Sequence, residues 1–335
     1  MPFINDILQH KSLSIVGLEK NTGKTECLNF VLNRLKSAGK QLAITSIGID
    51  GESIDQVTFT QKPEIELYEN TIFITSEKHY KERRLTSEVL DISERRTSLG
   101  RLVTARVLST GKVILSGPTD TVWLKQCIQK MDSFGVDLTI VDGALSRKSL
   151  GSPAITDCMI LNTGAAVSTH FSTLIKKTQF VHGLIKLPKF ESPLTNKLID
   201  IDKGIWAIDE LNQMYDLEIP SVFMLEKYKA QMFKFGHIIY ASGVVGDKML
   251  DFLRVQKECS KTILIVKDYT RLFISKESYL AFLKKGGIIK VLLKTKLIAV
   301  CVNPTSPTGF VFNSEELCHK MSEELGIAVY DVRRI

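Results

Sequence analysis

The segment from Gly17 to Thr25, which reads GLEKNTGKT, constrains the fold of this chain more than any other. A short apolar run, Ser12–Val16, precedes it, and Thr25–Ala38 follows with apolar residues at the spacing of one helix face. A glycine-containing turn that ends in Gly-Lys-Thr between a strand and a helix is typical of a phosphate-binding loop. The sequence therefore predicts an α/β fold with this loop at the carboxyl end of a strand.

The residue types in the loop suit phosphate chemistry. Backbone N–H groups at a helix N-terminus favour an anion, and Gly23 lets the main chain approach it closely. Lys24 would reach the terminal phosphates as a point charge, and the Thr25 hydroxyl would hold Mg²⁺. A plain strand-to-helix turn stays the alternative. The residues expected to bind ATP or GTP here are Gly17, Asn21, Thr22, Gly23, Lys24, Thr25 and Glu26.

Three polar residues follow other predicted strands. Asp142 comes directly after the apolar run Leu138–Val141, the Walker B pattern, where a carboxylate could hold a metal-bound water or orient an attacking one. Asp50 follows the second strand and is a candidate Mg²⁺ contact. Asn162 follows another strand and could approach the base or ribose. For all three the alternative is an ordinary turn residue.

Short apolar strands alternate with amphipathic helices along most of the chain, which predicts a mostly parallel sheet with helices on both faces. Leu99–Leu108 is expected to be helical, and Ser242–Asp247 is expected to be a plain strand-to-helix turn. We expect three regions: a P-loop NTPase-like nucleotide-binding domain over 1–175, a connector over 176–235, and a second, smaller α/β domain over 236–335.

Composition excludes several classes of protein. No apolar run approaches the roughly 20 residues that cross a bilayer, and no signal-peptide pattern is present, so we expect a cytoplasmic protein without a membrane partner. The six cysteines and six histidines show no short metal-ligand spacing. The net charge of +7 is too dispersed to predict nucleic-acid binding. A basic run over 78–106 favours a solvated face, although one of its arginines could steady phosphate charge.

The loop departs from the general pattern, because five residues rather than four separate its two glycines. This longer loop resembles that of dethiobiotin synthetase and of the molybdopterin-guanine dinucleotide protein B family. Together with Leu99-Gly100-Arg101, Leu115–Pro118 and Val141–Ala144, it is similar to the B subunit of lysine 5,6-aminomutase reactivase, the KamB family of lysine fermentation.

The resemblance implies a nucleotide-dependent accessory factor, or chaperone, that restores a cobalamin-dependent aminomutase. Its implied partners are that enzyme and a MutS-like ATPase subunit, and the chain has no Asp-x-His-x-x-Gly pattern for binding cobalamin itself. The residues carried over are Gly17, Gly23, Lys24, Thr25 and Asp142. Two alternatives stay open: a ligase or kinase like dethiobiotin synthetase, and a non-catalytic nucleotide-sensing module. The sequence leaves nucleotide hydrolysis, a homo-oligomer and the choice between ATP and GTP undecided.

Overall fold

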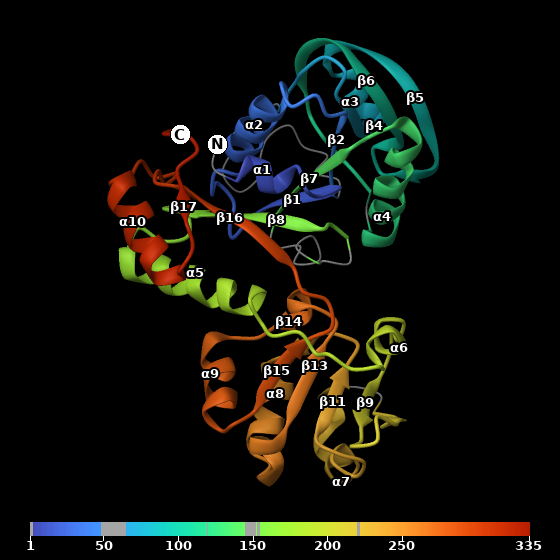
Figure 1. Cartoon of the computed structure of the whole chain (residues 1–335), viewed down its shortest axis with the longest axis vertical. Helices are drawn as coiled ribbons and strands as arrows, with labels where there is room; N and C mark the ends of the chain where they lie inside the picture. The colour runs from blue at the N-terminus through green and yellow to red at the C-terminus, as the bar shows by residue number, and fades with distance from the viewer. Residues whose placement is uncertain (1–2, 48–64, 119, 145–151, 153–154, 220–221) are drawn as a thin grey trace. The chain divides into compact units, whose positions relative to one another are not determined.

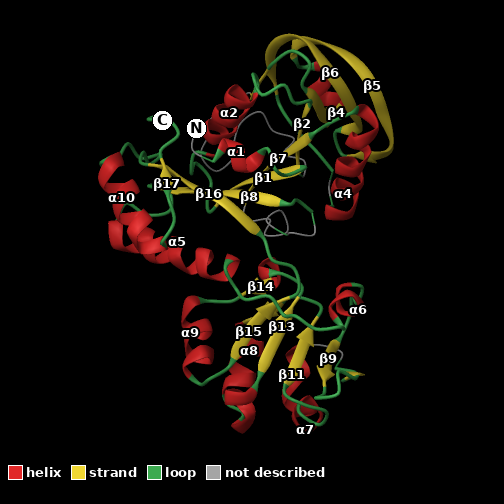
Figure 2. Cartoon of the chain, in the orientation of Figure 1, coloured by secondary structure: helices red, strands yellow, loops and turns green. Residues whose placement is uncertain are grey.

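The computed structural model describes residues 3–47, 65–118, 120–144, 152, 155–219 and 222–335, and every structural statement below refers to these residues (Figure 1). They form two compact units, each an α/β structure (Figure 2). Unit 1 combines Met1–Gln179 with Lys296–Ile335, and unit 2 is the intervening Phe180–Thr295. The chain passes between the units twice, once inside a helix and once before a strand.

Unit 1 is built on a ten-stranded sheet in the order β17-β16-β8-β1-β7-β2-β4-β6-β3, with β5 paired to β6. All neighbours from β17 to β4 are parallel, whereas β3, β4 and β5 each pair antiparallel with β6. The sheet is therefore mixed and mostly parallel. The strands are β1 (Ser12–Gly17), β2 (Leu42–Ser46), β3 (Ile65–Leu67), β4 (Ile72–Ser76), β5 (Arg84–Thr97), β6 (Gly100–Val113), β7 (Leu138–Ala144), β8 (Cys158–Gly164), β16 (Lys296–Asn303) and β17 (Val329–Tyr330).

Helices cover both faces of this sheet, as the buried apolar runs require. Strand β2 shows why: Ile44 packs with Leu28 and Leu32 of α2, whereas its neighbour Ala43 packs with Trp123 of α4. The α5 helix is tied to β8 by the Thr163 and Thr178 hydroxyls, 2.9 Å apart. The helices of unit 1 are α1 (Ile4–Ile7), α2 (Lys24–Leu35), α3 (Glu77–Lys81), α4 (Thr121–Lys130), the 3-10 turn η1 (Met131–Phe134), α5 (Phe171–Ile185, which runs on into unit 2) and α10 (Ser314–Leu325).

Unit 2 has a five-stranded sheet in the order β10-β9-β11-β13-β15, in which β11, β13 and β15 are parallel. A separate pair, β12 and β14, lies outside it. Its strands are β9 (Ile205–Ile208), β10 (Met214–Asp216), β11 (Ile238–Ala241), β12 (Val245–Gly246), β13 (Ile263–Val266), β14 (Leu272–Phe273) and β15 (Ile288–Val291). Its helices are α6 (Thr195–Ile199), η3 (Val222–Tyr228), α7 (Lys229–Met232), α8 (Asp247–Arg254), η4 (Lys257–Lys261), η5 (Tyr269–Arg271) and α9 (Lys276–Lys284).

This division differs from the expected one over 1–175, 176–235 and 236–335. The region expected to be a connector holds β9 and β10 of the unit 2 sheet, and the last 40 residues belong to unit 1 rather than to a second domain. Alternating strands and helices reveal elements, but they do not reveal which sheet a strand joins. Strand β16 pairs in parallel with β8, from Lys296 beside Cys158 to Asn303 beside Gly164.

The helix expected over Leu99–Leu108 is wrong, because these residues lie in the turn before β6 and in that strand. Over 102–105 both faces of β6 are buried, with Val103 and Ala105 toward α2 and Leu102 toward α4. Burial on both faces removes the alternation of apolar and polar residues, so this stretch lacks the period of two that marks a strand.

Candidate functional site

The loop between β1 and α2 has an unusual backbone. Asn21 and Gly23 are left-handed, with φ of 61° and 86°, whereas Thr22 between them is not. Such an alternation in the sign of φ is typical of the concave backbone that binds anions at the start of a helix. The Thr22 hydroxyl donates a 2.9 Å hydrogen bond to the Glu19 carbonyl and closes the turn from inside.

Both glycines of the loop are needed where they stand. A Cβ on Gly17 would lie 2.8 Å from Cγ and 2.9 Å from Cδ of Lys24, so the lysine side chain lies across this glycine. A Cβ on Gly23 would lie 3.0 Å from Cβ of Asn303, in addition to the strain of a left-handed alanine. The loop therefore folds its lysine back over the end of β1.

Lys24 points toward Asp142, the acid expected from the Walker B pattern. The ammonium lies 3.9 Å from Asp142 Oδ1, which is too long for a hydrogen bond, and both side chains are 21% exposed. Asp142 Oδ1 is buried and accepts no hydrogen bond from the described residues. The Lys24 ammonium, on α2, and the Asp142 carboxylate, on β7, thus face each other. Both groups can still bind a further ligand.

Asn162 holds the start of the loop from the other side of β1. It lies opposite Gly17 in the β1–β8 pair and is 1% exposed. Its carbonyl accepts a 2.8 Å hydrogen bond from the Leu18 N–H, and its side-chain amide donates to the Val16 carbonyl at 3.3 Å. Asn162 therefore supports the loop directly, whichever ligand the loop binds.

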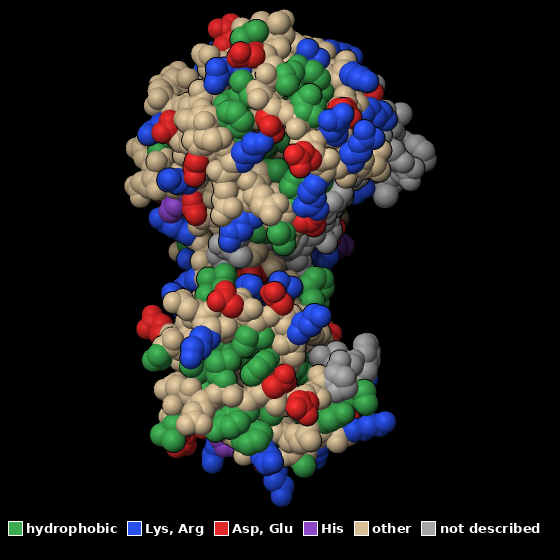
Figure 3. Space-filling model, turned by 90° about the vertical axis from the view of Figure 1, so that its right-hand side faces the viewer, with side chains coloured by type: hydrophobic (Ala, Val, Ile, Leu, Met, Phe, Trp, Pro, Cys, Tyr) green, Lys and Arg blue, Asp and Glu red, His purple; other side chains and the backbone are tan. Residues whose placement is uncertain are grey.

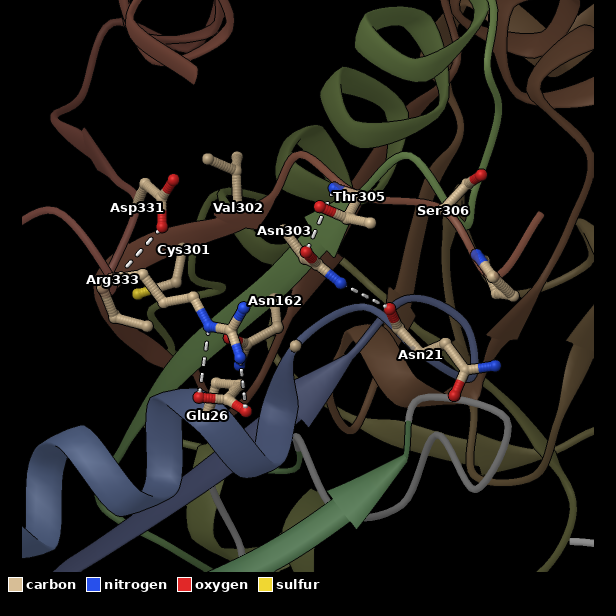
Figure 4. Close-up of a pocket in the computed structure, with 13 residues that line it drawn as sticks. Asn21, Glu26, Asn162, Cys301, Val302, Asn303, Thr305, Ser306, Asp331 and Arg333 are labelled. Atoms are coloured by element: carbon tan, nitrogen blue, oxygen red, sulfur yellow. Dashed lines mark hydrogen bonds and ion pairs between the residues drawn. The ribbon is translucent and has the colours of Figure 1, made fainter. Parts of the chain in front are cut away.

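A cavity of about 340 Å³ opens beside the loop, on the side of Asn162 rather than of Asp142 (Figure 4). Its wall combines Asn21, Gly23 and Glu26 with residues from the strand ends of β8, β16 and β17. The Arg333 guanidinium spans one side and contacts the Glu26 carboxylate through two nitrogens, at 3.1 and 3.4 Å. The structure thus brings most of the expected site residues together at one edge of the sheet.

The sequence analysis missed Asn303, Asp331 and Arg333, because it assigned all three to a second domain. Asp331 accepts hydrogen bonds from the Ser314 hydroxyl at 2.5 Å and the Arg333 N–H at 3.0 Å, so it orders the segment that carries Arg333. One signal was present in the sequence: Asn303 follows an apolar run, just as Asn162 does.

The floor of the cavity includes a buried thiol. Cys301 Sγ lies 3.8 Å from Cys27 Sγ, on α2. The hydrogen bond with Cys27 and then burial raise the pKa of Cys301 well above its usual range. The group at this floor is therefore a neutral thiol rather than a reactive thiolate.

A Mg²⁺ ion bound beside a triphosphate needs few protein ligands, because phosphate oxygens and water complete its octahedral shell. The buried Oδ1 of Asp142, which accepts no hydrogen bond from a described residue, fits that limited demand, and Thr25 lies in the first turn of α2. Across the described ranges, no group of three or more His, Cys, Asp or Glu side chains is placed to hold a metal ion. Asp50 lies outside the described residues.

Arg83 directly precedes β5, and the other arginines of the basic run lie on the β5–β6 hairpin. Arg95 pairs with Asp120 at 3.0 Å, Arg106 with Glu88 at 3.7 Å, and Arg101 with Glu77 at 3.8 Å. Basic and acidic side chains are interspersed on the face that Figure 3 shows. These contacts support the interpretation of the run as a solvated face.

No protein-family model matches this chain, and no curated protein or solved structure matches it either. Within the part of the chain that the structure describes, no helix is long and apolar enough to span a membrane. Support for a function therefore comes from the loop, from the residues around it and from the resemblance seen in the sequence.

Proposed function

We propose that unit 1 is a P-loop NTPase-like domain that binds a nucleoside triphosphate, ATP or GTP, with Mg²⁺ at the Gly17–Thr25 loop. The observation that carries this proposal is the left-handed backbone of Asn21 and Gly23 at the N-terminus of α2, with Lys24 folded toward Asp142. The loop backbone and the helix dipole together favour the negative charge of a phosphate chain.

Each residue has a definite task in this proposal. Lys24 moves from its 3.9 Å approach to Asp142 to the terminal phosphates, where its charge is better neutralised. Thr25 and Asp142 would hold the Mg²⁺, which would supply charge neutralisation at the phosphate oxygens. The nucleoside occupies the cavity beside Gly23 and Asn162, because that cavity is continuous with the loop. Glu26 and Arg333 flank it.

Hydrolysis would require a water positioned opposite the leaving phosphate, and Asp142 is the described acid closest to Lys24. By resemblance, we propose that nucleotide binding or hydrolysis drives an accessory cycle that restores a cobalamin-dependent lysine 5,6-aminomutase. Nucleotide state would then bias contact with that enzyme and with a MutS-like ATPase subunit. This accessory role depends on the three sequence segments that resemble the KamB family.

Calorimetric titration of the full chain with ATP and GTP, each with and without Mg²⁺, tests nucleotide binding. Thr25→Ala should reduce the Mg²⁺-dependent part of the affinity and leave metal-free affinity nearly unchanged, because the lost hydroxyl is a metal ligand. Thr25→Ser keeps a hydroxyl and serves as the matched control. Equal losses with and without Mg²⁺ would contradict the metal assignment, and no binding of either nucleotide would overturn the proposal.

The accessory role has a separate test. Purified aminomutase should be captured by the immobilised full chain in one nucleotide state more than in the others, and Lys24→Ala should abolish that difference. Failure to associate in any nucleotide state would count against the role. A metabolite-dependent release of ADP without a partner would instead favour a ligase or kinase, and binding without turnover in all mixtures would favour a nucleotide sensor.

A further inference from the structure

Asn303, the last residue of β16, contacts the Gly17–Thr25 loop at Asn21, 282 residues away in sequence. Its side-chain amide donates a 2.9 Å hydrogen bond to the carbonyl of Asn21, and its Oδ1 accepts one from the Thr305 N–H at 3.1 Å. Figure 4 shows the side chain pointing from the end of β16 to the loop. Both ends of this amide are therefore used, and its orientation is fixed.

The backbone of Asn303 is held as firmly as its side chain. Its carbonyl accepts a 2.9 Å hydrogen bond from the Ala165 N–H, just after β8. A Cβ on Gly164, the residue beside it in the β8–β16 pair, would collide with that carbonyl oxygen. Asn303 thus contacts the loop from a rigid strand end that is itself packed tightly against β8.

The hydrogen bond to Asn21 matters because of the peptide plane that it fixes. The carbonyl of Asn21 and the N–H of Thr22 belong to one planar trans unit and point in opposite directions. Asn21 is left-handed, a conformation that is uncommon outside glycine and costs free energy unless the surroundings hold it. Holding the carbonyl therefore also sets the direction of the Thr22 N–H, inside the part of the loop that would face phosphate.

We propose that Asn303 is a positioning residue for the phosphate loop: it keeps the Asn21–Thr22 peptide in the one orientation that suits an anion. The inference rests on the proposed nucleotide binding, and it adds a residue that no motif in the sequence marks. Its Cβ also lies against the position that a Gly23 side chain would take. Asn303 thus holds Asn21 by a hydrogen bond and leaves room only for glycine at position 23.

The test measures the affinity of the full chain for two probes, Mg·ATP and inorganic tripolyphosphate. Asn303→Ala removes one hydrogen bond to the loop and should weaken both probes about three- to tenfold. Asn313→Ala is the matched control, because Asn313 caps α10 in the same unit and accepts from the Glu316 N–H without contacting the loop. That control should lower stability and leave both affinities unchanged.

Asn303→Asp gives a readout that a merely structural role would not move. The carboxylate of the Asn303→Asp variant can still accept from the Thr305 N–H, but it repels the Asn21 carbonyl oxygen. At pH 8 this variant should therefore lose more affinity for both probes than Asn303→Ala. As the pH falls toward the ordinary Asp pKa of about 3.9, the carboxyl regains a proton and can donate, so the ratio of variant to wild-type affinity should rise. The ratio for Asn303→Ala should stay constant with pH.

Three outcomes separate the two proposals. If the wild-type chain binds neither probe, the proposed function fails and the role of Asn303 fails with it. If the wild-type chain binds both and the Asn303 variants match Asn313→Ala, only the positioning role is overturned. Selective losses with a pH-dependent ratio for Asn303→Asp would support both.

Discussion

Each unit contains a turn that leads from a strand into a helix and contains two glycines, yet the two turns differ in kind. In unit 1 the loop before α2 places Gly23 at φ 86° against Asn303, whereas in unit 2 the turn before α8 places Gly246 at φ −107°. A Cβ on Gly243 of that turn would meet nothing within 4 Å. Glycine alone therefore does not distinguish the two turns; the left-handed backbone of Asn21 and Gly23 beside Asn303 does.

Side-chain contacts sharpen the difference. In the unit 2 turn, Ser242 donates to the Gly204 carbonyl at 2.9 Å, and Asp247 accepts from the Ser275 N–H at 2.7 Å. These polar groups stabilise their own unit, and Lys248 follows in the first turn of α8 without a left-handed residue in the turn before it. The expectation of a plain strand-to-helix turn over Ser242–Asp247 agrees with these contacts.

The largest expected effect separates two lysines that each lie at the same distance from an aspartate. Lys24 lies 3.9 Å from Asp142 in unit 1, and Lys267 lies 3.9 Å from Asp202 in unit 2. Lys24→Ala should weaken Mg·ATP binding about 10- to 100-fold, because a charge-assisted phosphate contact is lost. Lys267→Ala should leave it unchanged. Calorimetric titration of both variants checks this, and equal affinities would remove Lys24 from the site.

A smaller effect is expected from the two glycines. Gly23→Ala forces alanine into a left-handed conformation at about 1–2 kcal/mol and presses its Cβ against Asn303, so affinity for Mg·ATP should fall about five- to thirtyfold. Gly243→Ala meets no neighbour and should change neither affinity nor stability measurably. Isothermal titration and urea unfolding of the pair test the comparison. A Gly23→Ala chain that binds like wild type would show that the loop does not need its left-handed backbone.

The smallest effect concerns acid sensitivity in unit 2. Burial, and then the charge of Lys186, lowers the pKa of His182, in the part of α5 that belongs to unit 2. Its contribution to stability is complete above the unfolded pKa of about 6.5 and declines as the pH falls toward the lowered folded value. Between pH 7.5 and 5.5 the wild-type chain should lose more stability than His182→Gln.

The two tryptophans allow this loss to be assigned to a unit, because Trp123 lies in unit 1 and Trp206 in unit 2. Urea unfolding followed by fluorescence in a Trp123→Phe background reports on unit 2 through Trp206. Parallel pH profiles for wild type and His182→Gln in that background would contradict the assignment to His182.

Local chemistry made part of this structure predictable from sequence. The capping residue Asn313 and the acidic residues that follow it predict a helix over Ser314–Leu325, and α10 has these bounds. The strand and helix around Gly17–Thr25 are also confirmed, since their periodic apolar residues are separated by a turn. Helices and strands whose ends are marked by local sequence signals could thus be predicted without knowledge of the fold.

Long-range pairing could not be located in the same way. Nothing in the local pattern of Leu297–Val302 indicates that this strand pairs with β8 rather than with the strands of unit 2. The contacts of Asn303 and Arg333 with the loop side of unit 1 follow only from that pairing. The first 25 residues of the chain therefore predict what kind of site to expect, but they do not predict all the residues that surround the loop.

The insertion of unit 2 into unit 1 also sets an order of events during translation. Asn21 leaves the ribosome 282 residues before Asn303, which at about 5–20 residues per second is an interval of roughly 14–56 s. Throughout that interval the loop has no amide to hold it, and from its own synthesis until that of β16 the strand β8 has a bare edge. A nascent chain of this protein therefore has to protect an unfinished sheet until β16 has been synthesised.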